Sequence, residues 1–455
     1  MNYRRFVVTA VTVPIRSLLL AIALASVLFL VPANLVSADS GLEVLRADAI
    51  SEFPDGLRFV FEARSTREVD DVRVRFAVAG QSTTQYNYLA LEPGDVIKGE
   101  YFYRTGQRDR YVPPGAEFTF FYEVDFKDGT NESTEPRSFL FQDSRYTWSE
   151  LTKGPITVYY HGPVQKRAQL VADIALATFE NMGPVTGADT RAPMRIVIYN
   201  NNAEMIGAVS IRSLTSARQL ITEGQAFAQH NLVIAQAGAD RAAGVISHEV
   251  THILVGRATQ NAVGGVPVWL NEGLAEYGNL DPGLSYVRYL EWAIDTDRVV
   301  PIVYLDNFPA DPNLTIVAYG EARSIVEFMV TTWGEAKIAA LLAKFNSGVP
   351  FRQALLDVYG FDTQELDSRW RKSVGAKPFE PAPAATPTPV PAATPEPRPT
   401  PEPPGVPQPT ATATPAPSGG GCTASARGGR AEASAFAIFA IPVALAGIGI
   451  ARRRP

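Results

Sequence analysis

The chain has 455 residues, of which 46% are hydrophobic and 19% are charged, and its formal net charge is −6. This length is too great for one ordinary domain and indicates two or three, and the apolar fraction excludes a largely disordered chain. The mild acidity does not favour nucleic-acid binding, which requires a basic face. A single cysteine excludes an internal disulfide framework and any metal site with several cysteine ligands.

Residues 1–38 have the pattern of a secretory signal peptide. Three arginines precede an apolar run from Ser17 to Val31, and Val36-Ser37-Ala38 supplies the small residues that cleavage requires. We expect the mature chain to start near Asp39, and an uncleaved N-terminal anchor is the alternative. Either interpretation places the folded part of the chain outside the cytoplasm.

Residues 41–148 are predicted to form an all-β domain. Segments such as 57–63, 72–78 and 117–124 alternate in polarity or carry β-branched and aromatic side chains. Turn sequences that contain Pro, Asp and Gly separate these segments. Several short strands at this spacing favour a sandwich of immunoglobulin or fibronectin type III kind. No group of residues in this region looks catalytic, so we expect it to act as a spacer or a binding module.

Residues 154–376 are predicted to form an α+β domain, in which a mixed sheet is followed by a mostly helical part. Residues 156–160, 194–199 and 231–235 have the composition of strands, and residues 168–181 have helical apolar spacing. Helical patterns dominate the rest of the region. A strand-rich beginning followed by a helical remainder is typical of this fold class.

The C-terminal part of the chain is predicted to be a stalk followed by a membrane anchor. Residues 377–421 are rich in Pro, Ala and Thr, which favours an extended and disordered stalk. Residues 422–455 begin with Cys422 and contain an uncharged apolar stretch, 433–451, which is long enough to span a bilayer as a helix. Three arginines follow this stretch and are expected to stay on the cytoplasmic side.

The Gly-Cys motif, the apolar stretch and the arginine cluster together resemble bacterial C-terminal sorting signals. In some of those families the tail is cut and the cysteine is lipidated, so the resemblance makes Cys422 a candidate lipid anchor. A simple membrane helix with an incidental cysteine is the alternative that the sequence leaves open. Both interpretations predict a protein that is secreted and anchored at the cell surface by a single membrane span.

Two of the four histidines lie in the segment His248-Glu249-Val250-Thr251-His252. On a helix, residues i and i+4 share one face, so the two imidazoles can converge on one Zn²⁺ ion. Glu249 follows His248 directly and is placed to take a proton from a water molecule on the metal. The remaining histidines, His161 and His230, have no partner at ligand spacing, and we expect both to be structural.

A catalytic zinc site needs a third protein ligand and an open position. The segment from Trp269 to Tyr277, with the sequence W-L-N-E-G-L-A-E-Y, offers Glu272 for this purpose. Residues 261–267 have the composition of a loop that lets this second helix fold back on the first.

The H-E-x-x-H motif followed by N-E-G-x-A-x-Y resembles the gluzincin metallopeptidases, and in particular the bacterial peptidases that share this catalytic domain. The resemblance implies a zincin-like fold for the α+β domain. It also implies that His248, His252 and Glu272 bind Zn²⁺ and that Glu249 is the general base.

The same resemblance suggests supporting residues. Thermolysin-like enzymes place an acidic residue at the position of Glu276 to hold a metal-bound histidine, here His248. Aminopeptidase-N-like enzymes use a downstream tyrosine to stabilise the oxyanion, and Tyr319, where a helix is predicted to begin, is the candidate. Arg323 is a weaker candidate for binding a substrate carboxylate. A solvated glutamate, a packing tyrosine and a solvated arginine are the structural alternatives.

Peptidases of these families pair an extended substrate with a strand at the edge of their sheet, and residues 231–235 are the strand that we assign to this role. The chain has no G-x-M-E-N segment, with which aminopeptidase-N relatives hold the free amine of the substrate. Its absence favours an endopeptidase over an exopeptidase.

The sequence therefore predicts a surface-tethered zinc metallopeptidase that hydrolyses peptides or proteins with a zinc-bound water activated by Glu249. One alternative is a surface binding or adhesion protein with a structural or vestigial zinc site. Another is a hydrolase of cell-wall peptides. The expected partners are a peptide substrate and the membrane, without nucleic acid, and the sequence does not specify the oligomeric state.

Overall fold

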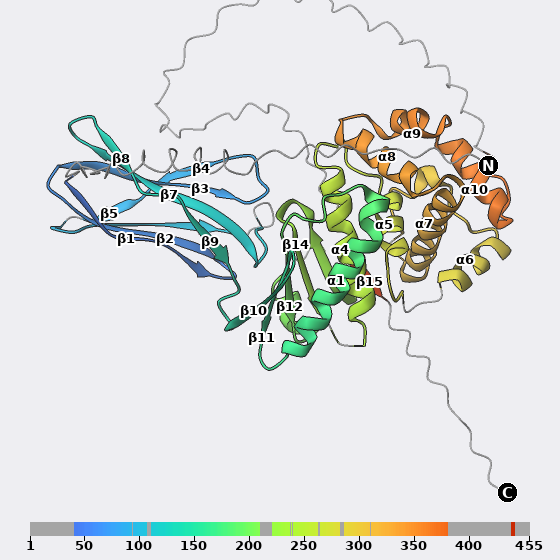
Figure 1. Cartoon of the computed structure of the whole chain (residues 1–455), viewed down its shortest axis with the longest axis horizontal. Helices are drawn as coiled ribbons and strands as arrows, with labels where there is room; N and C mark the ends of the chain where they lie inside the picture. Colours follow the sequence, from blue (N-terminus) through green and yellow to red (C-terminus); the bar gives the residue numbers. More distant parts are fainter. Residues whose placement is uncertain are drawn as a thin grey trace, which may run out of the picture.

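The computed structural model describes residues 41–380 and 438–441, except 93, 107–110, 210–220, 237, 239, 263, 283–285 and 310. Two antiparallel sheets are followed along the chain by a mixed sheet and then by a helical part (Figure 1). The predicted signal peptide, Cys422 and nearly all of the predicted stalk lie outside the described residues. Among the helices of the described segments, none is long and apolar enough to cross a bilayer.

The N-terminal region consists of two antiparallel sheets that share one apolar core, which confirms the all-β prediction. The first sheet has the order β1 (Leu42–Glu52), β2 (Gly56–Ser65), β6 (Ile97–Arg104), β5 (Ala90–Glu92). The second has the order β4 (Gln85–Tyr88), β3 (Val69–Val78), β7 (Ala116–Phe126), β8 (Asn131–Ser133), and β9 (Arg137–Phe141) also pairs with β7. Aromatic rings at alternate positions pack between the two sheets. The ring centroids of Phe59 in β2 and Phe76 in β3 are 4.9 Å apart, and those of Phe61 in β2 and Tyr122 in β7 are 5.1 Å apart.

The third sheet is mixed, as predicted for the second domain. Its order is β10 (Trp148–Lys153), β11 (Ile156–His161), β12 (Met194–Tyr199), β14 (Leu232–Gln236), β13 (Ile221–Phe227), β15 (Ile438–Ile441). The β11, β12 and β14 strands are parallel, while β10, β13 and β15 run antiparallel to their neighbours. Residues 149–153, between the two predicted domains, form most of β10 and so belong to this sheet.

The structure corrects two expectations about this sheet. Residues 231–235 were predicted to be the edge strand, but residues 232–235 belong to β14, which lies between β12 and β13. Part of the predicted membrane helix 433–451 is also different, because Ile438–Ile441 form β15 and pair with β13. Isoleucine and phenylalanine favour strands, and the outer edge of β13 offers backbone groups to an extended segment. The rest of 433–451 lies outside the described residues.

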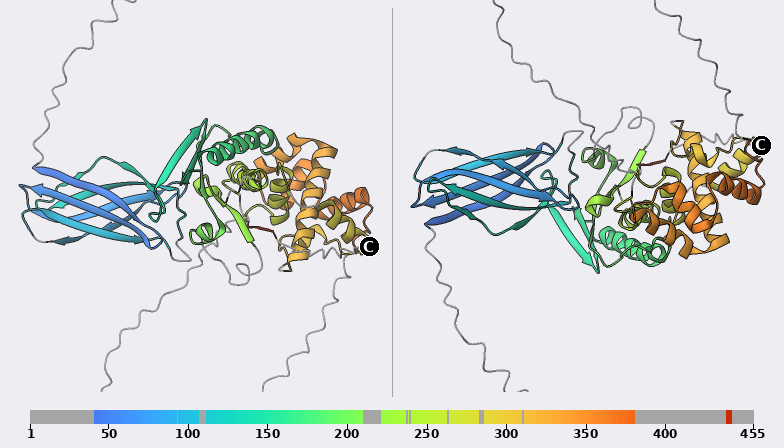
Figure 2. Two further views of the ribbon diagram at one scale, coloured as in Figure 1. Left: turned by 90° about the horizontal axis from the view of Figure 1, so that it is seen from below. Right: turned by 90° about the horizontal axis from the view of Figure 1, so that it is seen from above.

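The two faces of the third sheet are buried by different parts of the molecule. Alternate residues of β12 and β14, such as Ile196 and Val233, point into the core formed with the helices. The residues between them, such as Val197 and Leu232, belong to the core of the N-terminal region. The N-terminal region therefore covers one face of the sheet, and the helices cover the other (Figures 1 and 2).

Among the described residues, α-helices lie between strands at two places, after β11 and after β12, and from residue 242 to residue 374 the chain is helical without a strand. The helices are α1 (Gln165–Thr186), α2 (Asn202–Ile206), α4 (Ala242–Ala258), α5 (Val268–Tyr277), α6 (Tyr286–Asp295), α7 (Pro312–Trp333), α8 (Glu335–Asn346), α9 (Phe351–Tyr359) and α10 (Thr363–Val374). The α1 and α4 helices pack on the sheet, and α5 lies between α4 and α7 (Figure 1). This arrangement confirms an α+β domain with a mixed sheet and a helical remainder.

Candidate metal centre

The α4 helix carries the H-E-x-x-H motif through the interior of the domain. It is apolar on nearly all sides because it packs against the sheet, α1 and α5, and fourteen of its seventeen residues are buried. His248 and Glu249 have no exposed surface, and His252 is 4% exposed. Burial of three ionisable side chains costs free energy unless they are paired or bind a cation. We therefore expect these three side chains to have buried partners of opposite charge, hydrogen-bond partners or a metal ion.

The structure brings His248, His252 and Glu272 together. The Nε2 atoms of the two histidines are 3.0 Å apart, and Glu272 Oε2 lies 3.5 Å from each of them. Glu272 comes from α5, which begins at Val268 directly after the predicted loop. Within the part of the chain that the structure describes, this is the one group of three His, Cys, Asp or Glu side chains with the spacing of a metal site.

These three side chains fit a zinc ion. Zinc bonds to histidine nitrogen and carboxylate oxygen measure about 2.0–2.2 Å, so ligand atoms on a tetrahedral ion lie roughly 3.3–3.6 Å apart. The separations of 3.5 Å fall in this range, and the separation of 3.0 Å between the histidines needs only a small adjustment. Two nitrogens and one carboxylate oxygen are also the donor set of several catalytic zinc sites.

The second nitrogen of each histidine has a partner on α5. His248 Nδ1 lies 3.0 Å from Glu276 Oε1, so Glu276 stands where the sequence comparison places it. His252 Nδ1 lies 3.0 Å from Asn271 Oδ1, a contact that the motif spacing does not predict. One helix therefore supplies Glu272 and both of the residues that fix the histidine rings. Such partners select the ring nitrogen that is left free for a metal.

Glu249 lies next to this cluster and against β13. Both of its carboxylate oxygens are buried, and no well-formed hydrogen bond reaches them from the described residues. A Cβ atom at Gly224 of β13 would lie 2.7 Å from Glu249 Cγ, so only glycine allows this close approach. The strand thus limits where the carboxylate can go, and it leaves the oxygens available for a molecule in the site.

Tyr319 lies beside His248, with 6.3 Å between the ring centroids, and is 6% exposed. It lies inside α7, whose first residue is Pro312, so the expectation that the helix begins at Tyr319 is wrong. Asp311 caps this helix by accepting a hydrogen bond from Leu314 N, and proline is favoured at the first helical position. Arg323, one turn further on, is half-buried and close enough to Tyr286 to oppose part of the rise in the pKa of that tyrosine, which is caused mainly by burial and by Glu276.

The ionisable groups of the cluster favour the binding of a cation. Burial disfavours the charged form of His248, but Glu276 and Glu272 outweigh it and raise the pKa of His248 to about 10. Burial opposes ionisation of Glu272, yet the two histidines lower its pKa to about 2. Burial raises the pKa of Glu249 to about 7, against the opposing effect of the histidines. A pocket with three buried carboxyl groups favours positive charge, which protons or a divalent metal ion can supply.

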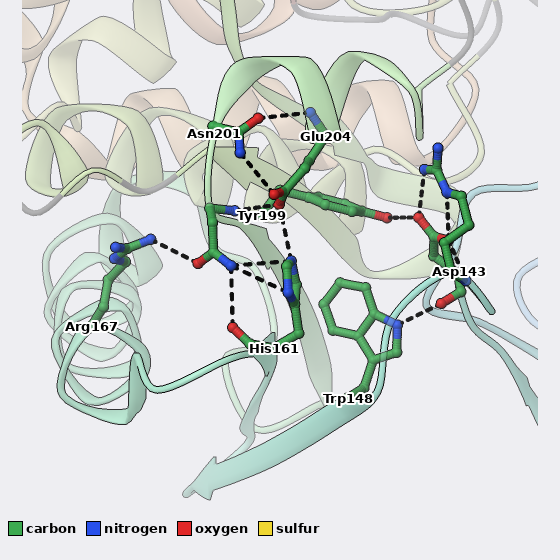
Figure 3. Close-up of polar contacts among 9 residues, drawn as sticks. Asp143, Trp148, His161, Arg167, Tyr199, Asn201 and Glu204 are labelled. Atoms are coloured by element: carbon green, nitrogen blue, oxygen red, sulfur yellow. Dashed lines mark hydrogen bonds and ion pairs between the residues drawn. The ribbon is translucent and has the colours of Figure 1, made fainter.

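The other two histidines lie away from the cluster, at the junction of the N-terminal region and the third sheet. His161 Nε2 lies 3.0 Å from Glu204 Oε2, and the ring of Tyr146 stacks on it at 4.2 Å. Figure 3 shows the polar contacts around His161 and Glu204, and beside them the hydrogen bond that Tyr199 donates to Asp143. His230 Nδ1 lies 2.9 Å from the carbonyl oxygen of Ala79 in the N-terminal region. Both contacts are those of structural residues.

Residues 171–376 match the family model described as the Peptidase MA superfamily. Among solved structures, an M1 zinc metallopeptidase from Deinococcus radiodurans is similar over 72% of this chain and 94% of its own, with 11% identity and a TM-score of 0.33. A mutant of a two-domain M1 zinc metallopeptidase bound to L-arginine is similar over 75% of this chain and 96% of its own, with 11% identity and a TM-score of 0.33. No curated protein matches the chain.

The crystal structure of a Br derivative of BhCBM56 is similar over 21% of this chain and 88% of its own, with 14% identity and a TM-score of 0.16. These TM-scores are too low to assign a function, so the function depends on the geometry of the buried cluster. The family match covers His248, Glu249, His252, Glu272 and the elements that carry them. Residues 171–376 are thus similar to the Peptidase MA superfamily, and the buried His-His-Glu cluster lies inside the matched region.

Proposed function

We propose that the protein is a zinc-dependent peptidase whose metal ligands are His248, His252 and Glu272. The observation that carries this proposal is the convergence of three buried ligand atoms within 4.8 Å of one another in a region similar to the Peptidase MA superfamily. When bound, a zinc ion would act as a Lewis acid that lowers the pKa of a water molecule and polarises a carbonyl group.

Glu249 is the proposed general base. Its carboxylate lies against β13 and follows a ligand histidine in the chain, and both of its oxygens are buried without a well-formed hydrogen bond from the described residues. In this position it can take a proton from the attacking water and pass it to the leaving amine. A buried carboxylate suits this task because its pKa lies nearer to neutrality than that of an exposed one.

Tyr319 is the proposed donor to the developing oxyanion. It lies beside His248 in the interior, and burial followed by the charge of Glu272 raises the pKa of its hydroxyl well above the usual value. The hydroxyl therefore stays protonated and can donate a hydrogen bond throughout the reaction. Glu276 and Asn271 hold the two histidine rings and take no proton from substrate in this proposal.

The substrate is proposed to be an extended peptide, cleaved within the chain rather than at its end. In place of β14, the strand that can accept it is β13, because β13 borders Glu249 and its outer edge already pairs with a strand, β15. Backbone hydrogen bonds along such an edge bind peptides of many sequences. Endopeptidase action is also favoured by the missing G-x-M-E-N segment.

Export and surface anchoring remain proposals that rest on the sequence of the two ends. We propose that residues 1–38 direct export, and that residues 422–455 attach the protein to the membrane by a helix or by a lipid on Cys422. We also propose that the N-terminal sheets form an immunoglobulin-like or fibronectin III-like sandwich. Cell fractionation of the full chain and of Cys422→Ala tests the anchor, and recovery of both in the soluble extracellular fraction would contradict it.

The decisive experiment for the enzyme compares the full chain with Glu249→Gln. The variant should keep one zinc ion per chain but lose at least about 100-fold in the rate of peptide hydrolysis, because general base catalysis contributes about 10²–10⁴. Metal analysis and a quenched-fluorescence peptide library supply the two readouts. Zinc binding without hydrolysis of any peptide, including cell-wall peptides, would instead support an adhesion protein with a structural zinc site.

A further inference from the structure

Glu276 is held by residues outside the two motifs. We propose that Tyr286, at the start of α6, is a positioning residue that fixes Glu276 and thereby the ring of His248. The inference rests on the proposed metal site and assigns a function to a residue that neither the sequence motifs nor the family match single out.

The contacts around Glu276 form a closed set. Tyr286 donates a hydrogen bond from its hydroxyl to Glu276 Oε1 at 3.2 Å, and the same oxygen lies 3.0 Å from His248 Nδ1. Asn279 donates a hydrogen bond to the other carboxylate oxygen at 3.2 Å. Glu276 has no exposed surface and Tyr286 is 5% exposed, so bulk water does not compete for these positions. Both oxygens of the carboxylate are thus held in place.

The orientation of the Glu276 carboxylate matters because it contacts one ring nitrogen of His248, while the other ring nitrogen is the proposed metal ligand. Its Nε2 faces Glu272 and His252, and its Nδ1 faces Glu276. If the carboxylate turns, the ring can follow, and Nε2 then leaves the position that a metal ion requires. Residues that orient a ligand in this way affect metal affinity even though they do not touch the metal.

Tyr286 also packs against Tyr319, with 6.5 Å between the ring centroids, so a purely structural function is the alternative. Tyr286→Phe separates the two functions, because it removes the hydroxyl and keeps the ring. Tyr289→Phe is a matched control. Tyr289 lies in the same helix and packs, half-buried, against the small core of Tyr286, Ile316 and Tyr319, but it is not a hydrogen-bond donor to Glu276.

The test measures metal binding by the full chain. After removal of metal, Zn²⁺ affinity is measured by competition with a coloured chelator, and Co²⁺ is bound to record its visible absorption. We expect Tyr286→Phe to lower Zn²⁺ affinity about 3- to 10-fold, somewhat less than the loss of a direct ligand partner, and to change the Co²⁺ spectrum. Tyr289→Phe should match the unmodified chain in both measurements.

A second comparison separates positioning from packing. In a chain that already carries Glu276→Gln, Tyr286→Phe should lower Zn²⁺ affinity by much less, because the two residues act through one contact. Tyr286→Met removes the same hydroxyl with an adaptable side chain and serves where the phenylalanine variant does not fold. Equal Zn²⁺ affinity and equal Co²⁺ spectra in the unmodified chain and Tyr286→Phe would overturn the inference while leaving the proposed enzyme intact. Failure of the unmodified chain to bind metal would overturn both.

Discussion

At the scale of single residues, Glu321 shows that a buried acid need not belong to the site. It lies in α7 with no exposed surface, and its carboxylate accepts a hydrogen bond from Val300 N at 3.1 Å. Burial raises the pKa of Glu321 to about 8, partly offset by the Val300 amide and Arg371. In the unfolded chain a glutamate titrates near 4.3, so between these two values the folded state holds a proton that the unfolded state has lost.

The sign of this effect gives a prediction for stability. The folded state gains stability from Glu321 below about pH 4.3, and it loses this contribution as pH rises towards 8. Glu321→Gln keeps the acceptor for Val300 N and removes the titration. We expect the advantage of the variant over the unmodified chain to grow with pH, from about 1 kcal/mol at pH 5 to about 4–5 kcal/mol at pH 8.5.

Calorimetric unfolding of the full chain between pH 5 and 9 checks this expectation. The matched control is Glu327→Gln, an exposed glutamate of the same helix, which should follow the pH dependence of the unmodified chain. A constant difference between Glu321→Gln and the unmodified chain at all pH values would contradict the proposed protonation.

The metal cluster could be located from the sequence because its spacing is local to two helices. His248 and His252 share a helix face, as do Glu272 and Glu276, so the two motifs already specify which side chains point together. Asn271 stands inside the quoted motif, but its contact with His252 depends on how α4 and α5 cross. Tyr286 comes from a third helix, and no sequence spacing reports that its hydroxyl reaches Glu276.

At the scale of elements, β13 is where the sequence was least informative. Its sequence, I-T-E-G-Q-A-F, lacks a clear alternation of polarity and contains a glycine, so it was not predicted as a strand. The apolar run of β14 was predicted as the edge strand, although such a run is typical of a strand buried on both faces. The polar composition of β13 reflects its place near the edge of the sheet and beside Glu249.

The contact between β13 and α4 predicts the effect of Gly224→Ala. The new methyl group would lie within 3.0 Å of both Glu249 and Val245, so Glu249 or the strand has to move by several tenths of an ångström. Misplacement of a catalytic group by about 1 Å can cost about 100-fold in rate, and we expect a 10- to 100-fold loss of peptidase activity. Zinc binding should change little, because the three atoms nearest to the new methyl group belong to Glu249 and Val245 and not to a metal ligand.

Peptide hydrolysis and zinc content of the purified variant provide the measurement. Gly94→Ala is the control, since the nearest atom to its added Cβ is 3.5 Å away and its backbone suits other residues. Full activity in Gly224→Ala would show that Glu249 tolerates the displacement, and it would weaken the assignment of the fixed carboxylate as general base.

At the scale of the whole molecule, the N-terminal region stabilises the domain that carries the metal cluster, because it covers one face of the third sheet. Its core includes Val197, Tyr199, Leu232 and Ile234 of the third sheet, and it therefore buries a face that would otherwise be apolar and exposed. The sequence predicted two separate domains because each has its own pattern of elements. It could not predict this contact, since alternating apolar residues on a strand do not specify what covers each face.

The last prediction concerns β15, which covers the outer edge of β13. Its residues pair with Ile221, Thr222 and Gln225, directly beside the Gly224 that contacts Glu249. A peptide that adds to the same edge must displace β15, so its apparent affinity falls by the fraction of molecules in which the edge is free. A chain that ends at Glu380 should therefore show a lower KM for peptide substrates and an unchanged kcat.

Ala440→Pro in the full chain provides the matched variant, because proline cannot donate a backbone hydrogen bond to a neighbouring strand. It should reproduce the lower KM without loss of the rest of the tail, and equal KM values in all three proteins would contradict competition at this edge. Insertion of the segment 433–451 into a bilayer would remove β15 from β13 in the same way. The full chain in lipid vesicles should then have the KM of the shortened chain, which would link anchoring at the membrane to access to the site.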